Sequence, residues 1–184
     1  MVELSQLWIP LLGAAVATFV VSCLIHMVFK WHAAEYKGVP DEAATRAAMR
    51  NVAPGEYVIP WCADYKDMGT PEMLQKFKEG PVVKVIVRPS GAPGMGGTMG
   101  LWFALNLVIA AAAAYLAART LPVGASFLGV CRLVGCVVFL AYGVGSVTQG
   151  IWMGRPWSSV IKDLLDAFLY GLACAVIFGW LWPR

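Results

Sequence analysis

The sequence predicts an all-α membrane protein with four transmembrane helices and a small α+β soluble insert between the first two. Hydrophobic residues make up 59% of the 184 residues and charged residues only 14%, whereas a soluble domain is about 45–50% apolar and about 25% charged. The mean hydropathy is +0.68. This composition excludes a disordered chain, a basic nucleic-acid-binding arm and an ordinary water-soluble enzyme, so no nucleic-acid partner is expected.

Four apolar stretches are the predicted spans, at residues 7–29, 101–118, 127–147 and 163–182. Each is close to the ~20 residues that a helix needs to cross ~30 Å of hydrocarbon. Backbone polar groups cannot stay unpaired in lipid, so each stretch is expected to be helical. The segment before the first stretch contains Glu3 and no Lys or Arg, which argues against a cleaved signal peptide and for a retained anchor.

Residues 31–99 form the predicted insert, because they contain eight basic and eight acidic side chains. A short helix is predicted over residues 41–50. A second begins with Thr70 as N-cap and Pro71 in its first position, and ends at Gly80. Residues 56–60 and 82–88 are predicted to be extended and to pair as a ribbon. The Gly-rich residues 90–100 are expected to be a flexible linker into the membrane.

The orientation follows from the Lys and Arg residues beside the span ends, since cytoplasmic loops are richer in them. One side has six of these residues and the other side has only Arg119 and Arg184. The six are Lys30, Lys37, Lys84, Arg88, Arg155 and Lys162. The insert is therefore expected in the cytoplasm, with both termini outward.

Small residues are expected to bring the helices together, because close backbone approach drives helix association in lipid. In the fourth stretch Ala167, Gly171, Ala175 and Gly179 recur every four residues. Such faces are expected to hold the four helices together. The alternative is that one face binds another subunit.

A candidate polar cluster inside the membrane consists of His26, Asn106, Tyr142 and Asp166. Counting from the span ends places all four in the same cytoplasmic third. A carboxylate beside a buried histidine fixes its tautomer, as in proton relays and metal sites. The alternative is interfacial, with Lys162 and Asp166 paired at headgroup level because they are four residues apart on a helix.

The segment from Gly150 to Ser159 is predicted to be a rigid interfacial turn, because Pro156 blocks helix continuation. Within it Trp152, Arg155 and Trp157 are candidate contacts for lipid headgroups or a partner. The chain has no HExxH motif, no paired-His metal spacing and no nucleophile elbow. No cofactor, metal or catalytic residue is therefore predicted, and an enzyme is not expected.

Three stretches give the chain a resemblance. They are Ile25-His26-Met27 with Lys30-Trp31-His32, Pro71-Glu72-Met73 with Lys78-Glu79-Gly80-Pro81, and residues 152–159. With these stretches the chain resembles an uncharacterised family of small bacterial four-helix membrane proteins. The resemblance covers most of the chain. It implies a bacterial inner (plasma) membrane location and assigns no activity and no residue role.

The predicted function is that of a non-enzymatic accessory or scaffold subunit, because the sequence has small-residue helix faces and no catalytic constellation. Its partners would be the lipid bilayer and other membrane protein subunits or a second copy. The alternative is a small transporter or proton-linked membrane subunit that uses the His26 and Asp166 region. No inverted repeat is visible, which weighs against the alternative.

Overall fold

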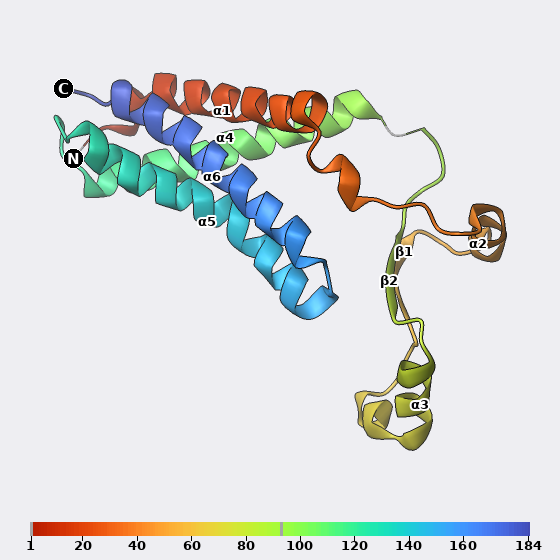
Figure 1. Cartoon of the computed structure of the whole chain (residues 1–184). Helices are drawn as coiled ribbons and strands as arrows, with labels where there is room; N and C mark the ends of the chain where they lie inside the picture. Colours follow the sequence, from red (N-terminus) through yellow and green to blue (C-terminus); the bar gives the residue numbers. More distant parts are fainter. Residues whose placement is uncertain (1, 93) are drawn as a thin grey trace. The chain divides into compact units, whose positions relative to one another are not determined.

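The structure is a computed structural model that describes residues 2–92 and 94–184. The chain forms two compact units (Figure 1). One consists of Met1–Lys37 with Gly94–Arg184, and the other of Gly38–Pro93. The second unit is narrower than the predicted insert, since residues 31–37 and 94–99 belong to the helical unit.

Three long helical segments of the first unit are apolar enough to cross a membrane: Leu4–Phe29, Met95–Thr120 and Phe127–Met153. The first segment is made of η1 (Leu4–Leu7), α1 (Trp8–Cys23) and the π-helical η2 (Leu24–Phe29), and the other two are α4 and α5. The stretch predicted as a fourth span lies on α6 (Trp157–Trp180), which begins with several charged residues and is not among the three. The fourth crossing therefore stays a prediction.

The helix α4 begins earlier than predicted, at Met95. The prediction of a flexible linker over residues 90–100 was therefore wrong for its last six positions. Thr98 donates its backbone N–H to the Gly94 carbonyl at 3.2 Å, which opens the helix. Glycine in a helix costs about 1 kcal/mol relative to alanine, but each residue added to an existing helix also gains a backbone hydrogen bond.

The helices α5 and α6 approach closely through their small residues. A Cβ on Gly171 would lie 3.0 Å from the Gly135 carbonyl oxygen, and one on Gly143 would lie 3.1 Å from the Ala167 Cβ. Helix α1 packs against α4 and against α6, burying Ala14 and Ala15 fully. The small-residue face of α6 is therefore used for packing within the chain.

One end of the helical unit, here the apolar end, contains both chain termini and the α4–α5 connection (Figure 1). The backbone N–H of Val2 bonds to the Ala118 carbonyl at 3.3 Å, and that of Gly124 to the Pro183 carbonyl at 2.8 Å. The buried Trp182 donates its Nε1–H to the Pro122 carbonyl at 3.0 Å. These bonds join the two ends of the chain to the same connection.

The second unit contains the helices α2 (Glu42–Met49) and α3 (Pro71–Glu79) and the strands β1 (Gly55–Ile59) and β2 (Val83–Val87). The strands pair antiparallel, with Tyr57 opposite Val85. Asp41 and Thr70 cap the two helices with their side chains. Met73 is the only buried residue that the structure describes within this unit, so the unit is too small for a core of its own.

Candidate functional site

The end of the helical unit opposite the termini is polar. It is formed by η2, by the following 3₁₀ turn η3 (Ala33–Glu35), by the α5–α6 turn and by the first turns of α6. We call this region the polar end. Its local geometry starts at η2, whose π-helical turns are wider than α-helical ones and recur at functional sites.

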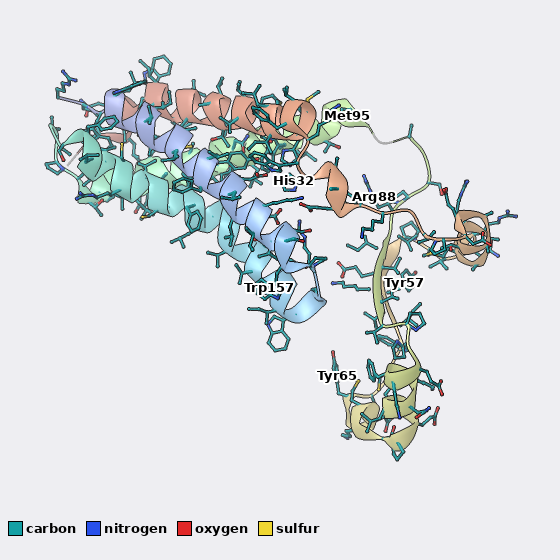
Figure 2. The ribbon with its side chains drawn as sticks, viewed as in Figure 1. His32, Tyr57, Tyr65, Arg88, Met95 and Trp157 are labelled. Atoms are coloured by element: carbon teal, nitrogen blue, oxygen red, sulfur yellow. The ribbon has the colours of Figure 1, made fainter. Side chains whose placement is uncertain are left out.

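Lys30 ends η2 in a left-handed conformation, with φ 52°. Its backbone N–H bonds to the Ile25 carbonyl at 2.8 Å. This turn ends the helix and brings the next two residues, Trp31 and His32, into contact with Asp166 of α6. His32 is labelled in Figure 2. The backbone conformation at Lys30 therefore decides which side chains meet α6.

Asp166 lies at the centre of the polar end and is only 5% exposed. Its Oδ1 accepts the indole N–H of Trp31 at 3.1 Å. Its Oδ2 lies 2.9 Å from Nε2 of His32 and 3.9 Å from Nε2 of His26. Within residues 2–92 and 94–184, no lysine or arginine forms an ion pair with Asp166. A buried carboxylate is costly without a positive partner, and here the two imidazoles occupy that place.

The two imidazoles are held in matching orientations. Their rings stack with centroids 4.9 Å apart and an interplanar angle of 4°. Nδ1 of His26 lies 3.0 Å from the Ser22 carbonyl, and Nδ1 of His32 lies 2.7 Å from Oε1 of Glu35. A carbonyl and a carboxylate only accept hydrogen bonds, so each Nδ1 donates a proton. The other ring nitrogen of each histidine, Nε2, faces Asp166.

Glu35 connects the histidines to a surrounding set of charges. Its Oε1 lies 3.5 Å from Nζ of Lys162, and its Oε2 lies 3.4 Å from an Nη of Arg155. Burial raises the pKa of Glu35, but the hydrogen bond and charge of His32, together with Ser159 and Lys162, lower that pKa below its ordinary value overall. Glu35 is therefore ionised at neutral pH and holds the Nδ1 proton of His32.

Arg155 and Lys162, two basic residues of the polar end, have other partners than Asp166. Arg155 forms a two-pronged pair with Asp163, one arm of which spans 3.1 Å. Lys162 donates to the Trp31 carbonyl at 2.6 Å. The sequence also allowed, as an alternative, a pair between Lys162 and Asp166 at headgroup level. In the structure Lys162 is paired with Glu35 instead. Arg155 is paired with the carboxylates of Asp163 and Glu35. The other two predicted lipid or partner contacts, Trp152 and Trp157, are 77% and 55% exposed.

A cavity of about 340 Å³ adjoins Asp166. It is lined by His26, Trp102, Leu105, Ile109, Ala141, Tyr142, Asp163, Asp166 and Tyr170. Behind its wall the Tyr142 hydroxyl donates to Oδ1 of Asn106 at 2.5 Å. The Nδ2 of Asn106 and the Nε1 of Trp102 are buried donors without a protein partner. Buried donors are almost always satisfied, so we expect water to enter this cavity.

The structure brings three of the four predicted cluster residues to the wall of this cavity. His26, Tyr142 and Asp166 line it, and Asn106 lies behind Tyr142. Sequence reasoning missed His32, Glu35 and the indole of Trp31, because residues 31–99 were assigned to the soluble insert. The spacing of His32 and Glu35, three residues apart, was the available signal.

No protein-family model matches the chain, and no curated protein or solved structure matches it significantly.

Proposed function

We propose that this chain is an integral membrane protein with four crossings that works as a small cation transporter, or as the ion-binding subunit of one. One observation carries this proposal. Two imidazole nitrogens and a buried carboxylate oxygen converge at the polar end, beside a cavity of about 340 Å³ that His26 and Asp166 line. Ionisable groups are rare within membrane-spanning segments and usually mark a path for a solute or an ion.

Four crossings are favoured by the arrangement of the helical unit. Both termini lie at its apolar end, and an even number of crossings returns a chain to the side where it began. Helix α6 has 24 residues, which corresponds to about 36 Å at 1.5 Å per residue. This length is enough to cross the hydrocarbon core of a bilayer.

The polar end is assigned to the cytoplasmic side of a bacterial inner membrane. Lys30, Arg155 and Lys162 lie at this end, and Arg119 and Arg184 lie near the other, which agrees with the bias of cytoplasmic loops toward basic residues. The resemblance to bacterial four-helix membrane proteins supports the same membrane. Cys62 of the second unit should then react with a membrane-impermeant maleimide only after lysis, and labelling in intact cells would contradict this orientation.

The charges around the site favour binding of a cation. Arg155 and Lys162 pair with Glu35 and Asp163, so Asp166 alone keeps a carboxylate oxygen directed at the two Nε2 atoms. An anion at this position would be repelled by the Asp166 carboxylate, whereas a cation would be attracted to it. The cavity supplies the route by which a hydrated ion reaches this position.

The proposal is tested by transport. The full chain is reconstituted into phosphatidylethanolamine–phosphatidylglycerol liposomes containing fluorescent indicators for protons and for divalent cations. Cation uptake should exceed that of protein-free liposomes, and Asp166→Asn should return it to that background. Asn keeps the shape of the side chain and its bond from Trp31.

The matched control is Asp67→Asn, which makes the same change at an exposed position of the second unit and should leave uptake intact. Equal size-exclusion profiles establish that the variants are folded. Uptake at the protein-free level for every cation tested, or equal uptake by the two variants, would contradict the transporter proposal.

An accessory or scaffold subunit remains a second proposal, favoured by a different observation. A Cβ on Gly96, Gly100 or Gly145 would meet no atom within 4 Å, so α4 and α5 present bare positions where another helix can approach. The occupant would be another membrane subunit or a second copy. Extraction in mild detergent should give a particle larger than one chain, and Gly100→Leu should reduce it; a strictly monomeric particle would contradict this proposal.

A further inference from the structure

We propose that the polar end binds one divalent transition-metal ion of the Zn²⁺ class through Nε2 of His26, Nε2 of His32 and Oδ2 of Asp166. This inference deepens the proposed function and rests on the same site, because it names the class of ion that the site takes. The three atoms lie within 4.8 Å of one another. The three residues are at positions 26, 32 and 166, so no short sequence motif predicts this set of ligands.

The separations of the three atoms suit a metal ion. Around Zn²⁺, tetrahedral ligands at ~2.0–2.1 Å from the metal lie about 3.3 Å apart. The Oδ2 of Asp166 is 2.9 Å from one Nε2 and 3.9 Å from the other, so the observed distances fall on either side of the required one. The two Nε2 atoms lie within 4.8 Å of each other, and their rings are stacked and parallel. The half-exposed side chain of His26 must therefore turn out of this stack before both nitrogens can bind one ion.

The surrounding hydrogen bonds fix each ligand in the form that binds metal. Metal-binding histidines usually donate their other ring N–H to a carbonyl or a carboxylate. His26 does so to the Ser22 carbonyl, and His32 does so to Glu35. The Trp31 indole holds Oδ1 of Asp166 and leaves Oδ2 directed at the imidazoles. A metal ion would take the place of the proton that now joins His32 to Asp166.

The ligand set selects the class of ion. Imidazole nitrogens favour Zn²⁺, Cu²⁺, Fe²⁺ and Ni²⁺, whereas Mg²⁺ and Ca²⁺ prefer oxygen ligands throughout. Three protein ligands leave a fourth position open to water or to an incoming group. The side chain of His26 is 49% exposed, so this fourth position faces water and the adjoining cavity. An ion can therefore enter and leave, which a closed structural site would prevent.

The test is metal binding by the full chain in detergent, with CoCl₂ as a spectroscopic probe and ZnCl₂ as competitor. One equivalent of Co²⁺ should produce visible absorption bands, and Zn²⁺ should remove them while a large excess of Mg²⁺ should not. Loss of a group that hydrogen-bonds a metal-binding histidine costs about 10–100-fold in metal affinity. We therefore expect Glu35→Gln to weaken binding by that factor.

Loss of a ligand should weaken binding by about 100-fold or more. His26→Ala is the safest ligand variant, since this side chain is half-exposed, and Asp166→Asn is the second. The matched control Asp67→Asn should bind as tightly as the unaltered chain, and so should Cys62→Ser. Binding that survives both ligand variants, or that shows a thiolate-to-Co²⁺ charge-transfer band, would overturn the metal site.

Failure of this inference differs from failure of the transporter proposal. Tight Zn²⁺ binding without cation uptake into liposomes would keep the metal site and reject transport. Uptake that depends on Asp166 without any Co²⁺ or Zn²⁺ binding would keep transport and reject the metal site.

Discussion

The two ends of the helical unit are held together by different kinds of interaction. At the apolar end, backbone hydrogen bonds and the buried Trp182 join the termini to the α4–α5 connection. At the polar end, carboxylates, histidines, Arg155 and Lys162 contact one another around Asp166. The charged residues of the apolar end, Glu3, Arg119 and Arg184, are all exposed, whereas Asp166 at the polar end is buried. The charges of the polar end therefore call for a functional explanation.

The largest effect on stability is expected at the apolar end, from Trp182→Ala. Trp182 is 4% exposed, and truncating a buried large aromatic side chain costs about 3–5 kcal/mol. Trp180, the last residue of α6, is 67% exposed, so Trp180→Ala should cost below about 1 kcal/mol, mainly the ring contact with Phe127. Denaturant titration in detergent micelles measures both. Equal losses would show that the apolar end is not packed as described.

A smaller loss is expected at the polar end from Glu35→Gln. The change keeps the size of the side chain but removes the charge that faces Lys162 and Arg155. Removing one member of a fully buried pair costs about 3–5 kcal/mol; partial access of water should reduce this to about 2 kcal/mol. Glu3→Gln makes the same change at an exposed position of the apolar end and should stay within about 0.5 kcal/mol.

The smallest effect is expected between the two ends, where α5 and α6 touch. In Gly171→Ala the new Cβ would lie 3.0 Å from the Gly135 carbonyl oxygen, and overpacking of this kind costs about 1–2 kcal/mol. Gly145→Ala meets no atom within 4 Å and should be neutral, or stabilise by up to about 1 kcal/mol through helix propensity. The difference between the two free energies of unfolding tests the close approach; its absence would argue against it.

Local sequence signals were enough for the elements of the second unit. Asp41, Thr70 and Pro71 are start signals that act within one helical turn, and α2 and α3 begin where these residues stand. Apolar length likewise predicted the three helical segments that can cross a membrane. The early start of α4 was missed, because glycine propensity is a weak guide once a long helix propagates.

The polar site was predictable only in part. His26 and Asp166 could be matched by their depth in the predicted spans. His32 and Glu35 could not, because they reach Asp166 only through the left-handed turn at Lys30. Nothing local in the sequence indicates that a lysine adopts this conformation, which costs free energy for a residue with a Cβ. The bonds from Trp31 and His32 to Asp166, across more than 130 residues, depend on this turn.

The decisive measurement is X-ray absorption at the zinc edge of the full chain, loaded with one equivalent of Zn²⁺. The proposed site should give nitrogen and oxygen neighbours at ~2.0–2.1 Å from the metal with the scattering pattern of two imidazoles, and His26→Ala should remove one imidazole. A sulfur shell near ~2.3 Å, or a shell without imidazole, would contradict it.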